Sequence, residues 1–69
     1  METTTLLTPR EIECLQALAH GLNNSGIAKQ LHIALPTVAM HLVNARRKLH
    51  AATREQAVAK AVKSGLVDP

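Results

Sequence analysis

The chain has 69 residues, which is enough for one small domain with a single core but too few to enclose a substrate pocket. Hydrophobic residues make up 46% of the sequence although Phe, Trp and Tyr are absent, so the core must consist of Leu, Ile, Val and Ala, which favours close-packed helices. The formal net charge is +3, and no segment is suited to cross a bilayer or to act as a signal peptide. We therefore expect an all-α cytoplasmic protein that is not an enzyme and has no catalytic residues.

The N-terminal part divides into a leader and the start of a helix. Residues 1–6 show no periodicity, so we expect a flexible leader there and one domain over residues 7–69. Thr8 is a good N-cap, Pro9 suits the first helical position, and Glu11 would complete a capping box. Together these residues are a specific signal for a helix start.

The first helix should carry an apolar row and end at Gly21, a typical C-terminal stop. Its apolar positions are Ile12, Cys14, Leu15, Leu18 and Ala19. Cys14 is the only cysteine, so no internal disulfide can form, and we expect it to be a small buried residue rather than a nucleophile.

Residues 24–49 predict two helices joined by a tight turn. Asn23 or Asn24 caps the first of them, and its buried face holds Ile27, Ala28 and Leu31. Residues 32–34 form the turn, and we expect Ile33 to fill the space between the two helices.

The third helix is predicted over Leu35–His50 and has two distinct faces. Its apolar stripe, which needs a partner surface, is Val38, Leu42, Ala45 and Leu49. The opposite stripe is Pro36, Met40, Val43, Asn44 and Arg47. A short helix, a sharp turn and a longer helix with a basic C-terminal end are typical of a DNA-reading helix-turn-helix.

A fourth helix is predicted from the cap at Thr53, with Gln56 completing a second capping box, to about Ser64 and Gly65. Its apolar side is Ala57, Val58, Ala61 and Val62. Two interpretations of this side stay open: complete burial within the monomer, or packing of a part of it against a second copy of the chain.

The charge distribution indicates a polyanionic partner. Between Cys14 and Arg54 the sequence contains no carboxylate, so nothing in this segment repels phosphate. The residues predicted to contact phosphate are Thr37, Arg46, Arg47 and Lys48. Because charge alone does not distinguish nucleic acid from solvent, a solvated basic face is the alternative.

The chemistry of the outer stripe determines which bases it can read. Met40 and Val43 of this stripe, and the adjoining Ala39, make no side-chain hydrogen bonds but can touch thymine methyl groups, which discriminates weakly between bases. Asn44 can bond adenine, and Arg47 can bond guanine, although we favour phosphate for Arg47 because most protein–DNA hydrogen bonds go to the backbone.

The order and spacing of many residues resemble the C-terminal DNA-binding domain of the LuxR family. They are Leu7-Thr8-Pro9-Arg10-Glu11, Gly21, Asn24, Ile27-Ala28, Leu31, Ile33, Thr37-Val38, His41, Lys48-Leu49, Arg54, Ala57-Val58 and Gly65-Leu66. The resemblance spans Leu7–Val67, and Asn44-Ala45 with Lys48-Leu49 and Ala57-Val58 resembles the quorum-sensing branch.

The resemblance implies a four-helix bundle with the third helix in the major groove, reading bases through Ala39, Met40 and Val43. It also implies dimerisation through the fourth helix, a two-fold-related double-stranded DNA site and transcriptional control, with RNA polymerase as a further candidate partner. A small-molecule inducer, which in the quorum-sensing branch is an acyl-homoserine lactone, would bind a separate domain. No cofactor is implied.

The sequence departs from the family pattern at five positions. Lysine is common where Ser25 and Ala39 stand, glutamate where Gly26 stands, a serine cap where Ala34 stands, and glycine or asparagine where His50 stands. These differences bear on affinity and base specificity.

The sequence also bears on two other functions, protein binding and metal binding. The apolar Met40 and Val43 suit a protein-binding surface, through which the chain could pair with a full-length LuxR-type regulator and block it. A metal site is disfavoured because no two histidines have the spacing that places ligands on one helix face; they are His20, His32, His41 and His50.

Overall fold

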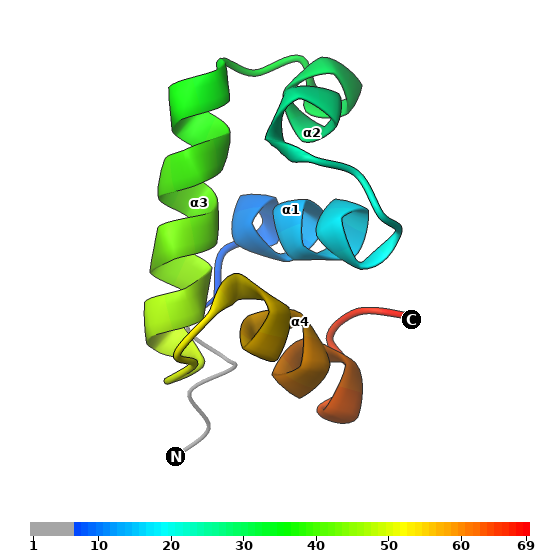
Figure 1. Cartoon of the computed structure of the whole chain (residues 1–69), viewed down its shortest axis with the longest axis vertical. Coiled ribbons are helices and arrows are strands. Elements are labelled where there is room, and N and C mark those ends of the chain that lie inside the picture. Colours follow the sequence, from blue (N-terminus) through cyan, green and yellow to red (C-terminus); the bar gives the residue numbers. More distant parts are fainter. Residues whose placement is uncertain (1–6) are drawn as a thin grey trace.

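A computed structural model describes residues 7–69, and the predicted leader over residues 1–6 lies outside the described residues. The described part contains four helices: α1 (Pro9–Ala19), α2 (Asn24–Leu31), α3 (Leu35–Lys48) and α4 (Arg54–Lys63). The longest helix, α3, stands along one side of the molecule, and α2, α1 and α4 are arranged one below the other beside it (Figure 1). The predicted all-α fold is confirmed.

The helix starts follow the capping chemistry of the sequence. At α1 the Thr8 hydroxyl accepts from the Glu11 N–H at 3.1 Å, and the Glu11 carboxylate accepts from the Thr8 N–H at 3.0 Å, so the capping box is complete. At α4 the Thr53 hydroxyl accepts from the Gln56 N–H at 3.0 Å. The second predicted box differs by one residue, because the Gln56 side chain accepts from the N–H of Ala52 rather than from that of Thr53.

The two helices of the helix-turn-helix start differently. Asn23 caps α2 by accepting from the Gly26 N–H at 2.9 Å. Ala34, the N-cap of α3, has extended backbone angles but makes no side-chain cap. The start of α3 therefore lacks the side-chain hydrogen bond that Asn23 supplies to α2.

All four helices end with a residue in left-handed backbone conformation. At α1 and α4 this residue is the predicted glycine, Gly21 with φ 92° and Gly65 with φ 78°. At α2 and α3 it is His32 with φ 57° and His50 with φ 55°, where a side chain is less favourable. The third helix therefore ends at Lys48, two residues earlier than predicted.

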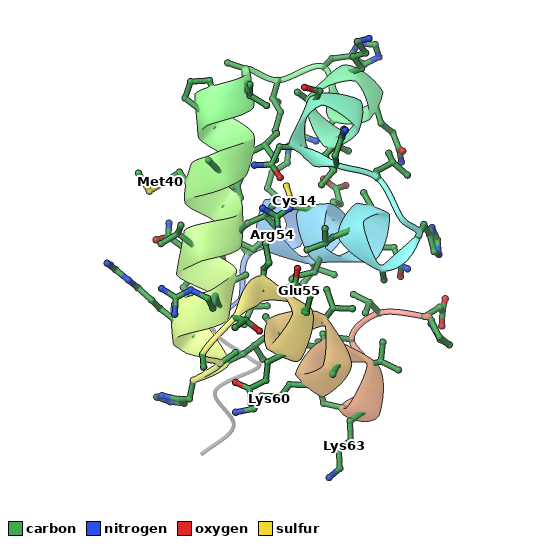
Figure 2. All side chains as sticks on the ribbon, in the orientation of Figure 1. Cys14, Met40, Arg54, Glu55, Lys60 and Lys63 are labelled. Carbon is green, nitrogen blue, oxygen red and sulfur yellow. The ribbon has the colours of Figure 1, made fainter. Side chains whose placement is uncertain are left out.

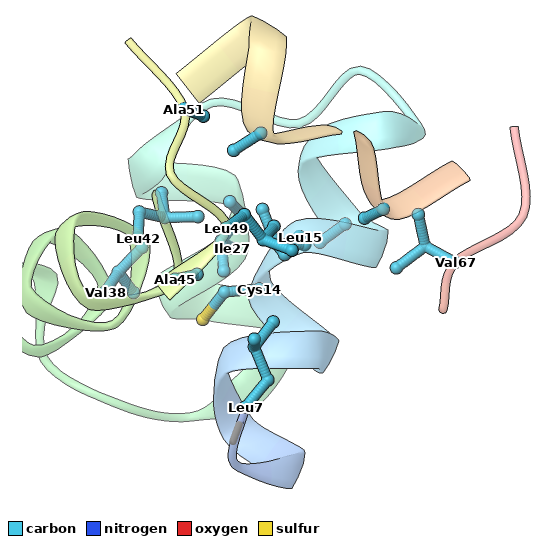
Figure 3. Packing of buried hydrophobic residues seen from close by; sticks show 13 residues of the cluster. Leu7, Cys14, Leu15, Ile27, Val38, Leu42, Ala45, Leu49, Ala51 and Val67 are labelled. Carbon is cyan, nitrogen blue, oxygen red and sulfur yellow. The ribbon is translucent and has the colours of Figure 1, made fainter. Parts of the chain in front are cut away.

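The core lies where α1, α2, α3 and α4 meet, because α1 and α3 each contact all three other helices. The predicted stripe of α3 is buried, with exposed fractions of 0% for Val38, 4% for Leu42 and 6% for Leu49. Cys14, Leu15 and Ile27 fill the centre between the helices (Figure 3). Ile33 packs half-buried against this core, as the turn requires.

The C-terminal residues fold back over α1. Val67 is buried, and the Gln16 side chain both donates to the Asp68 carbonyl and accepts from the Asp68 N–H, each at 2.9 Å. Within residues 7–69, no helix has the length and hydrophobicity needed to span a membrane.

Candidate nucleic-acid interface

The outer face of α3 brings most of the predicted reading residues together. Met40 is 58% exposed and projects away from the body of the molecule (Figure 2), and Val43 is 38% exposed. One shallow hollow is lined by Pro36, Ala39, Met40, Val43, Asn44 and Arg47. The two faces of α3 are therefore separated as predicted: one face lies in the core and the other meets solvent.

Leu35 is a further exposed residue that sequence reasoning did not place on this face. It is 48% exposed, and it precedes Ala39 and Val43 by one and two turns of the helix. No signal for this exposure was present in the sequence, because Leu35 continues the three- and four-residue spacing of the buried stripe that begins at Val38.

The three consecutive basic residues at the end of α3 have different surroundings. Arg47 is exposed on the outer face, as predicted for a phosphate or base contact. Arg46 is partly buried and donates from Nη1 to the Ala51 carbonyl at 3.0 Å, so it also holds the connection to α4. Of these three residues, Arg47 alone is exposed, whereas Arg46 and Lys48 are partly buried.

Lys48 forms an ion pair within the chain. Its Nζ atom donates to both carboxylate oxygens of Glu11, at 2.9 and 3.1 Å. The Glu11 side chain is 4% exposed and the Lys48 side chain 31%. Lys48 therefore links α3 to α1 and balances a buried charge, and its role as a phosphate contact stays a prediction.

The surroundings of Glu11 keep it ionised. Burial raises the pKa of the carboxyl group, but the hydrogen bonds from Lys48 and from the Thr8 N–H, with the charge of Lys48, outweigh burial and lower the pKa below its ordinary value. The ion pair between Glu11 and Lys48 thus joins the first turn of α1 to the last turn of α3.

A second groove lies beside α3, toward the N-termini of α2 and α4. Its lining is Asn24, Ala39, Leu42, Val43, Arg46, Ala52, Thr53, Arg54 and Glu55. Arg54 Nη2 donates to Asn24 Oδ1 at 2.6 Å, which ties α4 to the start of α2. Sequence reasoning matched Arg54 to the family but missed this role, because its partner lies 30 residues away.

Glu55 places a negative charge beside the segment whose sequence is free of carboxylates. The central segment is free of carboxylates in sequence, yet Glu55 of α4 lines the groove beside α3, as does Arg54. Figure 2 shows Arg54 and Glu55 at the start of α4, between α3 and α1. The groove beside α3 therefore carries charges of both signs.

Thr37 is exposed in the first turn of α3, and its N–H donates to the Ala34 carbonyl at 3.0 Å. Its hydroxyl is thus placed at the N-terminal end of the helix, where backbone amides favour phosphate. Its role as a phosphate contact stays a prediction.

The four residues of α4 predicted for dimerisation differ in their burial. Ala57 and Ala61 are fully buried inside the chain, so they belong to the monomer core. Val58 and Val62 are only half-buried. Val58 lines a groove with Leu18, Ala19, Gly21, Leu22 and Glu55. The apolar side of α4 is thus divided between the two interpretations that the sequence left open.

Other kinds of chemistry find little support in the described residues. Cys14 is fully buried, and burial, with the negative charge of Glu13, raises the pKa of its thiol, which keeps it protonated. Among residues 7–69, no three His, Cys, Asp or Glu side chains gather as they would around a metal ion.

The fold and the exposed face of α3 define the class of protein: this is a helix-turn-helix DNA-binding domain of a transcription regulator. Its structure matches that of the transcription factor GerE with a TM-score of 0.86 and 35% sequence identity, covering 91% of this chain and 94% of the other. Residues 5–61 match the family described as GerE, bacterial regulatory proteins, luxR family. The chain belongs to this family.

Three relatives illustrate the similarity. The chain is 45% identical over 64 residues to the HTH-type quorum sensing-dependent transcriptional regulator VjbR of Brucella ovis, covering 93% of this chain and 25% of that protein. It is 51% identical over 61 residues to the HTH-type quorum sensing-dependent transcriptional regulator RpaR of Rhodopseudomonas palustris, covering 88% and 25%. It is 40% identical over 62 residues to the transcriptional activator protein LuxR of Aliivibrio fischeri, covering 90% and 25%. The chain therefore spans about a quarter of the length of these relatives.

Proposed function

We propose that the chain binds double-stranded DNA sequence-specifically by inserting α3 into the major groove. The observation that carries the proposal is the division of α3: Val38, Leu42 and Leu49 anchor it, while Met40 and Arg47 face outward. The major groove, about 12 Å wide, admits one α-helix. Arg47 and Thr37 contact phosphate or base edges, Asn44 reads a base, and Arg46 supports the backbone from the side.

A salt titration of binding by fluorescence anisotropy tests this proposal. If about six phosphates are neutralised per dimer, affinity should fall by roughly 10³-fold between 50 and 200 mM salt. Arg47→Ala should weaken binding about tenfold, as expected for the loss of a contact worth roughly 1–3 kcal/mol. Lys63→Ala, which removes the same charge at the exposed end of α4, is the matched control and should change affinity little. Equal effects of the two variants would contradict the groove-face assignment.

We also propose that two copies bind a two-fold-related site through α4. Val58 and Val62 are the valines of α4 that keep exposed surface, and the groove around Val58 can receive a facing side chain. Val58→Asp or Val62→Asp should abolish cooperative binding to a paired site while leaving binding to a single half-site intact. Unchanged cooperativity in both variants would remove α4 as the contact.

The similarity to quorum-sensing regulators supports a role as the effector domain of such a regulator, acting in the cytoplasm. In that arrangement an inducer binds a separate domain, and RNA polymerase is the candidate partner when the regulator activates transcription.

The exposed apolar residues of α3 favour one alternative, a module that pairs with a full-length LuxR-type regulator and blocks it. This alternative predicts that the chain shifts no duplex in a gel, even at low salt, and instead forms a complex with a homologous regulator in size-exclusion chromatography.

A further inference from the structure

The large hydrophobic residues that stay exposed are concentrated on one helix. Within residues 7–69 they are Leu35, Met40 and Val43, with exposed fractions of 48%, 58% and 38%, and all three belong to α3. Single exposed apolar residues are common, but three within nine positions of one helix, two of them on the face assigned to DNA, call for a physical reason.

The outer face of α3 also has a direction. After the exposed Thr37 of its first turn, the face is apolar at Ala39, Met40 and Val43, whereas the polar Asn44 and the basic Arg47 follow toward its C-terminal end. Because a helix rises about 1.5 Å per residue, Leu35 and Val43 are separated by roughly 12 Å along the axis. At about 3.4 Å per base pair this distance corresponds to roughly three or four base pairs.

The bases offer one apolar group in the major groove. The edges of adenine, guanine and cytosine present hydrogen-bond donors and acceptors, while thymine adds a C5-methyl group. An aliphatic side chain placed over a donor or acceptor removes its water without replacing the hydrogen bond, which is unfavourable. Placed over a methyl group, the same side chain buries apolar surface, which is favourable.

We propose that the apolar part of the outer face of α3 reads the C5-methyl groups of pyrimidines, so that the bound site carries thymines opposite Met40 and Val43. This inference rests on the proposed DNA-binding function and names the base feature that this chain selects. Asn44 and Arg47 then select hydrogen-bonding edges in the adjoining base pairs. Position 39 carries alanine, which places no hydrogen-bond donor beside Met40 and Val43.

The two central residues differ in how strictly they select. Val43 is β-branched and holds one preferred rotamer in a helix, so it fits a methyl group only at a fixed position. Met40 is unbranched and adapts to irregular surfaces. Val43 therefore gives the sharper discrimination of the two.

The experiment starts from a duplex selected from a random pool by the chain itself. Each thymine of that duplex is then replaced by deoxyuridine, which keeps every hydrogen-bonding group and removes only the methyl. We expect about a fourfold loss of affinity at each contacted thymine, the factor that corresponds to one buried methyl-sized group. A second comparison sets 5-methylcytosine against cytosine at the same positions. Tighter binding to 5-methylcytosine shows that the methyl group itself is read, whatever base carries it.

Variants assign the effect to residues. Met40→Ala and Val43→Ala should each remove the deoxyuridine penalty at one position, because alanine is too short to reach the methyl. Arg47→Ala is the control, because it should weaken binding to the thymine and deoxyuridine duplexes by the same factor.

The outcomes separate this inference from the function on which it rests. Binding of a selected duplex with no deoxyuridine penalty anywhere, or with penalties unchanged by both alanine variants, overturns the methyl readout but leaves DNA binding standing. Failure to bind any duplex at low salt, or complex formation with a homologous regulator instead, overturns both.

Discussion

Leu42 and Val43 are consecutive residues of α3 and have opposite surroundings. Leu42 is 4% exposed in the core, whereas Val43 is 38% exposed on the outer face. Arg47 and Lys48 repeat the contrast, because Arg47 lies in solvent and Lys48 pairs with Glu11. One residue step turns a helix by about 100°, so a single helix supplies both the core of a small domain and the surface that contacts its ligand.

The largest effect should come from truncating the buried member of the first pair. Leu42→Ala should lower the free energy of unfolding by about 2–5 kcal/mol, because it leaves a cavity in the core. Native stability is about 5–15 kcal/mol in general and a domain of this size lies near the lower end, so most of it is lost. Urea denaturation followed by circular dichroism measures this change.

Val43→Ala is the matched variant on the outer face. It should change the free energy of unfolding by no more than about 0.5 kcal/mol, as expected for an exposed site, while weakening DNA binding. Equal destabilisation by both variants would contradict the assignment of the two faces.

The second pair, Arg47 and Lys48, should show the same contrast in the free energy of unfolding, but with a smaller difference. Lys48→Ala leaves the buried Glu11 carboxylate without its ion-pair partner and should cost about 1–3 kcal/mol, whereas Arg47→Ala should stay within about 0.5 kcal/mol. The double variant Glu11→Gln/Lys48→Ala should recover part of the loss, because it removes the buried charge. If Lys48→Ala retains full stability but loses DNA affinity, Lys48 is the phosphate contact that the sequence first predicted.

The sequence predicted those features that depend on neighbouring residues. The cap at Thr8, the stops at Gly21 and Gly65 and the buried stripe of α3 follow from local backbone chemistry and from a period of 3.6 residues. The sequence alone was therefore enough to predict these features.

The features that depend on distant partners could not be predicted. Glu11 and Lys48 are 37 positions apart, so nothing local marks Lys48 as the ion-pair partner of a buried carboxylate. Likewise, Ala57 and Val58 sit side by side in the apolar side of α4, and only the position of α1 and α3 decides which is core. Departures from the family gave one usable clue, since His50 has the left-handed conformation that explains the usual glycine or asparagine.

The pH dependence of stability should reveal the contribution of the Glu11–Lys48 ion pair without any substitution. The pKa of Glu11 is lower in the folded chain than its ordinary value of 4.5. A lowered folded pKa means that the pair stabilises the fold above the ordinary value, and that this stabilisation is lost as the pH falls through the folded pKa. Thermal melts of the native chain should therefore fall in midpoint below about pH 4.5.

Glu11→Gln provides the control, because glutamine can still close the capping box with Thr8 but cannot titrate. Its melting midpoint should be lower than that of the native chain at neutral pH and should converge with it in acid. Parallel curves at all pH values would show that Glu11 contributes no proton-linked stability.

The smallest effect concerns the start of α3, which both faces share. Ala34 has the extended backbone of an N-cap but makes no side-chain hydrogen bond there, unlike Thr8, Asn23 and Thr53 at the other three helices. Ala34→Ser should add about 1 kcal/mol, which for a domain of this size raises the melting temperature by about 4–8 °C. Ala59→Ser, at an exposed position inside α4, is the control and should give no gain, because serine is a weaker helix former than alanine there. A gain at both positions would trace the effect to serine itself rather than to the missing cap.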